Sequence, residues 1–215
     1  MAQQLIDAIA SSGVTLVVID FEYTTPKGAS PEPIEVAVQA LQVRDGQLER
    51  GAAAEVLMRP PEHAALMAFD IEQTGITPEM LADVPPAGEV LAQLDRRFTS
   101  GPYLLVAHSA AAEARLLANY QQACPNLAHT DLLDTVRLAR VLYPDLDRHG
   151  LDHLIFHLKM QPPANRHRAM GDVQVTTDLF IRMLQESSWA DLRELRKIAG
   201  ITAEATKPVQ ASLFG

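Results

Sequence analysis

Two acidic residues, Asp20 and Glu22, close a mostly apolar run that extends from Val14 to Ile19. Side chains two residues apart on a strand point to the same face, so this spacing brings two carboxylates together at the end of a buried strand. Such a pair is electrostatically costly unless a cation neutralises it. The spacing therefore predicts a metal site, and the alternative interpretation is a pair of surface charges at a strand end.

Residue types suited to the same chemistry recur later in the chain, at Glu113, His167 and Asp172. Carboxylate oxygens are hard ligands that suit Mg²⁺ and Mn²⁺, and histidine accepts protons near neutrality. A spacing of five would place His167 and Asp172 about 140° apart on one helix. We therefore expect Asp172 in the first turn of a helix and His167 in the preceding loop. Taken alone, Asp172 is equally an acid favoured by the helix dipole.

The elements that position these residues follow from apolar periodicity and turn residues. Strands are expected over 14–22, 34–43, 47–58 and 103–107, with Asp45-Gly46 as a hairpin turn. Helices are expected over 3–11, 89–98, 110–120, 132–142, 151–158, 170–185 and 189–199, and Thr77-Pro78 begins a short one. This order predicts an α/β fold with a mixed sheet, antiparallel at first and parallel later, flanked by helices.

Three segments resemble the exonuclease motifs of the DEDDh 3′→5′ exonucleases, the family that includes the epsilon subunit of bacterial DNA polymerase III, exonuclease X and ribonuclease T. They are VVIDFE at 17–22, VAHSAAAEARLL at 106–117 and HRAMGD at 167–172. Intervening segments that agree with the family are PIEV at 33–36, GITPEM at 75–80, DT at 134–135 and LAR at 138–140. The resemblance implies a ribonuclease-H-like fold.

The same resemblance implies a set of functional residues. Asp20, Glu22 and Asp172, with Glu113 acting through water, would hold two divalent ions, Mg²⁺ or Mn²⁺, and two such ions stabilise both the attacking and the leaving oxygens. His167 would be the general base for the attacking water, so that a nucleoside 5′-monophosphate leaves from a 3′ end. The implied substrate contacts are Phe21, Tyr23, Thr24, His108 and Arg166.

Two positions depart from the family pattern. Glu113 stands where the family usually has aspartate, and Tyr23 precedes Thr24-Thr25 as though one residue were inserted. The longer side chain of Glu113 keeps a second class of function open, in which a catalytically impaired exonuclease fold binds nucleic acid or a replication partner. For His108, packing at a strand end is the alternative to a role in the site.

The formal net charge of −9 argues against a broad DNA-coating surface. Arg166 and Arg168 flank His167 and would place positive charge where a phosphate lies, unless they are merely solvated. No apolar run approaches the length of a membrane span. One cysteine, Cys124, and the lack of a secretory leader favour a cytoplasmic protein that does not interact with membranes.

The final residues include Gln210-Ala211-Ser212-Leu213-Phe214, which resembles the pentapeptide that binds the bacterial polymerase sliding clamp. The implied contacts are Gln210, Leu213 and Phe214; a tail folded back on its own domain and a remnant of a longer segment are the alternatives. Because clamp partners act on DNA, single-stranded DNA 3′ ends are the expected substrate, and short RNA is the alternative. We expect an exonuclease domain over 1–186 and a C-terminal helix and tail over 187–215.

A histidine series, His149, His153 and His157, has the spacing of one stripe on a helix. Such a stripe can bind zinc. Because no acidic or cysteine partner is forced nearby, we expect a solvated or partly packed face instead.

Overall fold

A computed structural model describes residues 2–203. Its six-stranded sheet has the order β3-β2-β1-β4-β5-β6, and the predicted change from antiparallel to parallel pairing is confirmed. The strands are β1 (Thr15–Tyr23), β2 (Pro33–Arg44), β3 (Gln47–Leu57), β4 (Tyr103–Ala107), β5 (Leu132–Asp134) and β6 (Gly200–Ile201).

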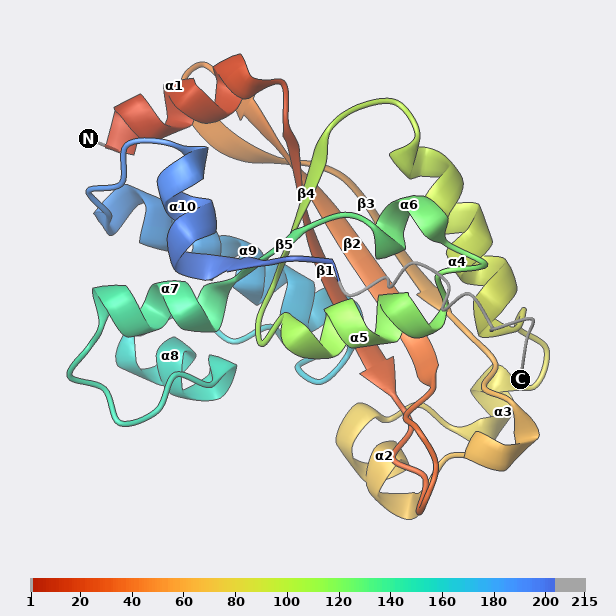
Figure 1. The fold of residues 1–215 in the computed structure, drawn as a ribbon. Coiled ribbons are helices and arrows are strands. Elements are labelled where there is room, and N and C mark those ends of the chain that lie inside the picture. The colour runs from red at the N-terminus through yellow and green to blue at the C-terminus, as the bar shows by residue number, and fades with distance from the viewer. Residues whose placement is uncertain (1, 204–215) are drawn as a thin grey trace, which may run out of the picture.

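Helices cover both faces of this sheet (Figure 1). On one face lie α1 (Ala2–Ser12), α7 (Thr135–Leu142), α8 (Leu151–His157), α9 (Ala169–Glu186) and α10 (Leu192–Ala199). On the other lie α4 (Ala87–Asp95), α5 (Ala111–Asn119) and α6 (Pro125–Ala128), with the 3₁₀ turn η2 (Arg96–Phe98). The segment after β3 holds η1 (Glu62–Ala64), α2 (Ala68–Thr74) and α3 (Pro78–Leu81).

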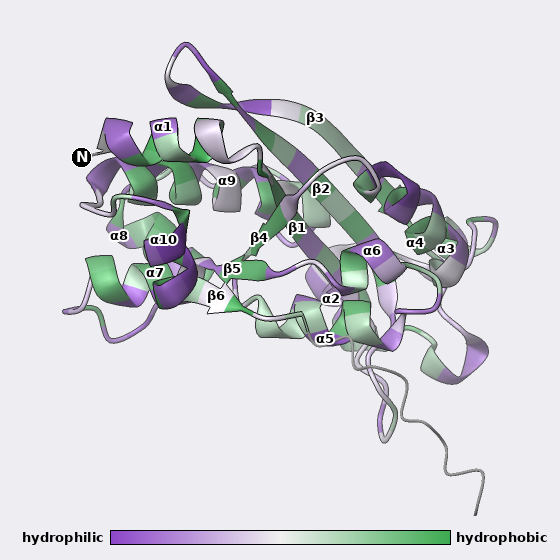
Figure 2. Ribbon diagram, turned by 45° about the horizontal axis from the view of Figure 1, so that its top comes forward, coloured by the Kyte–Doolittle hydropathy of each residue, from purple (hydrophilic) through white to green (hydrophobic). Residues whose placement is uncertain are grey.

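Strand β1 is buried on both faces because its side chains alternate between two cores. Leu16 and Val18 pack in the cluster that contains α9, whereas Val17 and Ile19 pack in the cluster that contains α4 and α5. In Figure 2, β4 and β5 are coloured as hydrophobic, whereas α10 carries hydrophilic residues. The even-numbered positions of β1 therefore face α9, and this parity decides where the acidic residues at its end point.

The hairpin between β2 and β3 forms at the predicted turn. Asp45 and Gly46 both have positive φ angles, 49° and 74°. Two successive residues with positive φ are typical of the type I′ turn, whose twist matches that of the flanking strands. The turn therefore sets the register of an antiparallel pair that begins with Arg44 opposite Gln47.

One predicted element is wrong at its start, because residues 132–134 form strand β5 instead of the first turn of a helix. Leu132 and Leu133 are fully buried and pair in parallel with β4. Asp134 ends the strand and caps α7, since its side chain accepts a hydrogen bond from the Val136 amide. The strand is too short to show a two-residue period. β6, which pairs with β5, lies in a segment that was expected to be part of the tail.

The predicted histidine stripe does not form on one helix. His149 precedes α8, and its Nε2 lies 3.0 Å from the carbonyl oxygen of Tyr143. Among residues 2–203, the acidic and histidine side chains close enough to share an ion belong to a different group, described below. The expectation that these histidines form a solvated or partly packed face stays a prediction.

Residues beyond 186 continue the same core. Trp189, Leu195 and Ala199 are buried in the cluster that contains α9, and α10 packs against α7. None of the helices in the described part of the chain has the length and apolar character needed to cross a membrane.

Candidate functional site

Three carboxylates meet at the end of β1. Asp20 and Glu22 occupy the strand positions that face α9, and Asp172 lies in the first turn of that helix. One oxygen from each side chain lies within 4.8 Å of the oxygens of the other two. His167 is in the loop before α9, so the predicted separation of loop histidine and helical aspartate is confirmed.

Glu113 approaches the same place from the opposite side, in the first turn of α5. It is only 5% exposed, and its Oε2 has no hydrogen-bond partner among the described residues. It lies outside the group of three, but its charge is near enough to raise the pKa of Asp20. A buried oxygen without a partner is a group that a bound ion or an ordered water would satisfy.

Burial is the main influence on the pKa of Asp20, Glu22 and Glu113. It raises the pKa of Glu22 and of Glu113 to about 8. Burial, followed by the negative charges of Glu113 and Asp172, raises the pKa of Asp20 well above its ordinary value. A cation bound among these oxygens would lower the pKa of the carboxyl groups, because it favours their charged form. The donor set consists of hard carboxylate oxygens, which fit a divalent ion such as Mg²⁺ or Mn²⁺.

The loop before α9 is held by two arginines that the sequence suggested for phosphate binding. Arg166 pairs with Asp172 and, at 2.9 Å, with Asp152 of α8. It is therefore engaged with carboxylates and does not line the cleft. His167 has a φ of 66°, and its amide lies 3.4 Å from Oδ1 of Asp172.

Arg168 is held by Glu35, a β2 residue that is completely buried. Its Nε lies 3.1 Å and 3.0 Å from the two oxygens of Glu35, and the Ala169 amide donates to the same carboxylate at 2.9 Å. Glu35 therefore binds the arginine and caps the first turn of α9 at once. This side chain was not among the predicted site residues, because its partners are more than 130 positions away in the sequence.

A glycine allows the loop to pack on α9. A Cβ built at Gly171 would lie 2.3 Å from the carbonyl oxygen of Asn165. This distance is shorter than real Cβ contacts, so a side chain here would displace the loop that carries His167.

The acids and the histidine open into a cleft of about 300 Å³. Its lining comes from β1, α2, α5 and the start of α9: Asp20, Phe21, Glu22, Tyr23, Thr25, Phe69, Asp70, Gln73, Thr74, His108, Ser109, Ala112, Glu113, His167 and Asp172. The predicted contacts Phe21, Tyr23 and His108 are in this lining. Thr24 is not, because it is fully buried, where its Oγ1 accepts a hydrogen bond from the Glu32 amide at 3.2 Å.

Residues of α2 were missed in the sequence. Phe69, which is 61% exposed, and Gln73 line the cleft from this helix. Asp70 fixes the helix to the loop that follows β1, since its carboxylate accepts hydrogen bonds from the Thr25 hydroxyl at 2.5 Å and the Thr25 amide at 3.2 Å. The available signal was the position of α2 immediately before the GITPEM segment.

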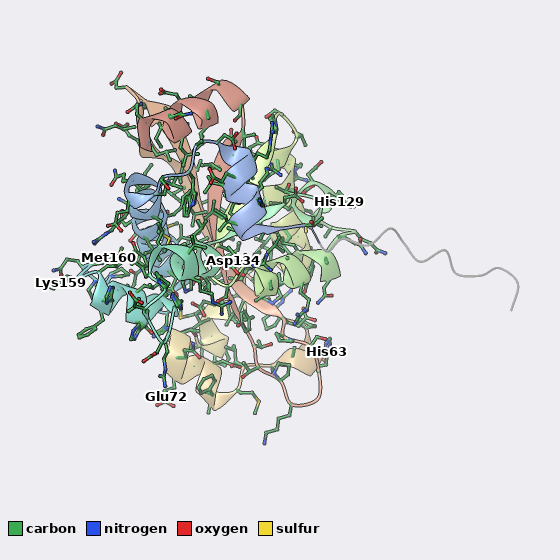
Figure 3. All side chains as sticks on the ribbon, turned by 60° about the vertical axis from the view of Figure 1, so that its left-hand side comes forward. His63, Glu72, His129, Asp134, Lys159 and Met160 are labelled. Atoms are coloured by element: carbon green, nitrogen blue, oxygen red, sulfur yellow. The ribbon has the colours of Figure 1, made fainter. Side chains whose placement is uncertain are left out.

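His108 is neutral in this setting, because burial lowers its pKa to about 4. The Thr135 hydroxyl donates to the Ala107 carbonyl at 3.3 Å, so at 2.8 Å it accepts from Nδ1 of His108. Asp134, which Figure 3 labels between α5 and α7, accepts a hydrogen bond from the Ser109 amide at 3.2 Å. These contacts fix the turn from β4 into α5 and thus the place of Glu113.

Comparisons of the sequence with a family model and with known proteins point to the same family. The family model described as "Exonuclease" matches residues 17–180. DNA polymerase III PolC-type from Bacillus cereus is 32% identical over 174 residues, or 80% of this chain and 11% of that protein. A DNA polymerase III subunit epsilon-like protein from Rhodobacter capsulatus is 32% identical over 176 residues, or 80% of this chain and 24% of that protein. The chain thus spans about a tenth and a quarter of these relatives.

Solved structures share the fold. The nuclease domain of 3′hExo, a DEDDh family member bound to rAMP, has a TM-score of 0.68 and 21% identity, covering 80% of this chain and 92% of that one. Exonuclease X in complex with 5′ overhanging duplex DNA has a TM-score of 0.60 and 23% identity, covering 86% and 97%. At these identities the likeness concerns the fold.

The anchoring role of Glu35 predicts a large loss of stability on substitution. In Glu35→Gln, the Arg168 guanidinium loses its carboxylate, and we expect the free energy of unfolding to fall by about 3 kcal/mol. Urea denaturation measures this change. Glu186→Gln is the matched control, because Glu186 pairs with Arg182 at the surface and should cost no more than about 1 kcal/mol. Equal losses in the two variants would contradict the anchoring role.

Removal of one acid should stabilise the protein when no cation is present. In EDTA near pH 8, we expect Asp20→Asn to unfold about 2–4 °C above the parent, roughly 1 kcal/mol, because a buried like charge is gone. The gain should shrink as the pH falls towards the ordinary pKa of aspartate, because burial and the charges of Glu113 and Asp172 raise the pKa of Asp20 in the folded protein and its ionised form then favours the unfolded chain less. Mg²⁺ should then raise the melting temperature of the parent but not of the variant.

Thermal melts of both proteins in EDTA and in Mg²⁺ test this expectation. Asp147→Asn, which alters an exposed acid in the loop before α8, is the control and should follow the parent. A parent that melts at the same temperature with and without Mg²⁺ would contradict the cation site.

Proposed function

Because the chain belongs to the exonuclease family, we propose that it is a metal-dependent 3′→5′ exonuclease that acts on the 3′ ends of single-stranded DNA and releases nucleoside 5′-monophosphates. The observation that carries the proposal is the convergence of Asp20, Glu22 and Asp172 with His167 in one cleft. The predicted membership in this family, and with it the nuclease class, is confirmed by the family match and the polymerase III relatives.

The roles of the side chains follow from their places in the cleft. Asp20, Glu22 and Asp172 would hold the divalent cations, with Glu113 reaching them through water. When bound, such ions supply positive charge to the attacking and leaving oxygens of a phosphodiester. His167 accepts the proton of the attacking water, and the Asp172 carboxylate near its amide orients the loop that carries it. Phe21 and Tyr23 would contact the terminal nucleotide.

DNA is favoured over RNA as the substrate. The two relatives described above, each 32% identical, are named as DNA polymerase III proteins, and one structural neighbour is bound to duplex DNA. Another neighbour is bound to rAMP, so exoribonuclease activity on short RNA is the alternative that a substrate comparison must test. A role in replication or repair and a cytoplasmic location stay predictions.

The impaired-exonuclease alternative rests on the glutamate at 113. Its carboxylate lies in the cleft lining, with one oxygen unpartnered. This placement supports a side chain that still serves the site, and therefore an active enzyme.

Substitution on α9 tests the activity. We expect Asp172→Asn to slow the shortening of a 5′-labelled single strand in Mn²⁺ by roughly 10³-fold, because a cation ligand worth several kcal/mol is lost. Asp178→Asn on the same helix is the control, since Asp178 is exposed and pairs with Arg50, and it should cut normally. A parent protein that leaves the strand intact would contradict the proposed function.

The tail provides a second, independent prediction. Gln210, Leu213 and Phe214 lie outside the described residues, and their proposed partner is the bacterial sliding clamp. Replacing Leu213 and Phe214 by alanine should weaken clamp binding by roughly 30-fold, because apolar anchors dominate such interfaces. Surface plasmon resonance with immobilised clamp measures the change, with Ser212→Ala as the control. Retained affinity in the double variant would refute clamp binding through this motif.

A further inference from the structure

Among the described residues, the lining of the cleft contains acidic side chains but no lysine or arginine. Five of the residues that line it are aspartate or glutamate, and none is lysine or arginine. The two arginines beside His167 are engaged with Asp152, Asp172 and Glu35. Nucleic-acid affinity depends on cations that contact phosphates. Because the lining supplies neither lysine nor arginine, we expect the side-chain cations that contact a longer strand to lie beside the cleft.

A second pocket of about 170 Å³ adjoins the cleft. Helix α5 passes the end of β1 (Figure 1), and the lining of the pocket draws on both elements. Its lining is Tyr23, Pro31, Ala112, Arg115, Leu116 and Asn119. Tyr23 and Ala112 line both hollows, so the pocket continues from the cleft at these two residues.

Arg115 provides the missing cation. It is exposed on α5, two residues after Glu113, and takes part in none of the ion pairs found between described residues. Asn119 lies four residues further along the same helix face, and its amide can donate and accept hydrogen bonds. Tyr23 is 39% exposed, so part of an aromatic ring is available for stacking on a base.

The walls of this pocket are tied together. The Tyr120 hydroxyl, at the end of α5, donates to the Glu32 carboxylate. The Thr24 amide donates to the Glu32 carbonyl at 2.9 Å, which links the same residue back to the end of β1. The loop over 24–32 and helix α5 are therefore joined across the pocket, and its shape exists before a ligand arrives.

We propose that this pocket binds the nucleotide that precedes the terminal one, with Arg115 on its phosphate and Tyr23 and Asn119 beside its base. The proposal rests on the proposed function, because it places the terminal nucleotide in the cleft. In this proposal the strand leaves the cleft past Tyr23 and Ala112, which line both hollows, and Arg115 is the cation in the lining of the second one. The pocket thus makes binding depend on the length of the strand.

Binding of a 5′-fluorescein-labelled (dT)₆ in Ca²⁺ tests the proposal, with a denaturing gel to show that the strand stays intact. We expect Arg115→Ala to weaken binding about tenfold, as for a lost charge-assisted contact. The slope of log affinity against log salt should become less negative by about 0.7, because one phosphate contact is lost. Arg115→Lys should keep the parent slope. Arg193→Ala, which removes an exposed arginine from α10, should match the parent in affinity and slope.

Competition by dTMP shows whether Arg115 contacts the terminal nucleotide or the one that precedes it. The ratio of the affinities for (dT)₆ and for dTMP should fall about tenfold in Arg115→Ala. An unchanged ratio, an unchanged salt slope, an equal loss in Arg193→Ala or no binding of (dT)₆ by the parent would overturn the proposal. The cutting assay of Asp172→Asn is independent of this result. If the protein binds through Arg115 but does not cut, the proposed exonuclease activity is refuted and the proposed nucleotide pocket stands. If it cuts but substitution of Arg115 has no effect on binding, the pocket is refuted and the activity stands.

Discussion

Mutual repulsion between buried and half-buried carboxylates is the constraint on which the rest of this structure depends. Asp20, Glu22 and Asp172 face one another within 4.8 Å, and Glu113 adds a fourth negative group nearby. Burial and neighbouring charges raise the pKa of Asp20, Glu22 and Glu113 when no cation is present. A fold that tolerates this arrangement must gain stability elsewhere, because uncompensated buried charge is among the largest local costs in a protein. The clustering of these carboxylates is therefore explained by the binding of a ligand and not by a contribution to the stability of the fold.

The scaffold imposes this arrangement of carboxylates through the positions of β1, α9 and α5. β1 is central and buried on both faces, so the parity of its side chains sends Asp20 and Glu22 towards α9. The buried Glu35 fixes Arg168 and the first turn of α9, and Gly171 lets the loop with His167 approach the helix closely. On the other side, Asp134 and Thr135 hold the turn that leads to Glu113. The four acids are thus positioned from three elements, β1, α9 and α5.

Much of this could be predicted from the sequence, because the informative signals are local. The apolar run before Asp20, the Asp45-Gly46 turn and the spacing of His167 and Asp172 each specify a backbone arrangement within a few residues. What the sequence did not reveal depends on distant contacts. The β5 strand is only three residues long and is stabilised by its pairing with β4. The roles of Glu35 and of Phe69 depend on which segments meet in space, and Arg166 was assigned to phosphate although Asp152 and Asp172 engage it.

The most direct test of the central claim is a crystal structure of the protein grown with Mn²⁺ and a nucleoside 5′-monophosphate. The account predicts anomalous density from Mn²⁺ between the carboxylates of Asp20, Glu22 and Asp172, with the phosphate of the nucleotide beside it. Mn²⁺ bound elsewhere, with Arg166 still paired to Asp172 and no ion among the three acids, would contradict it.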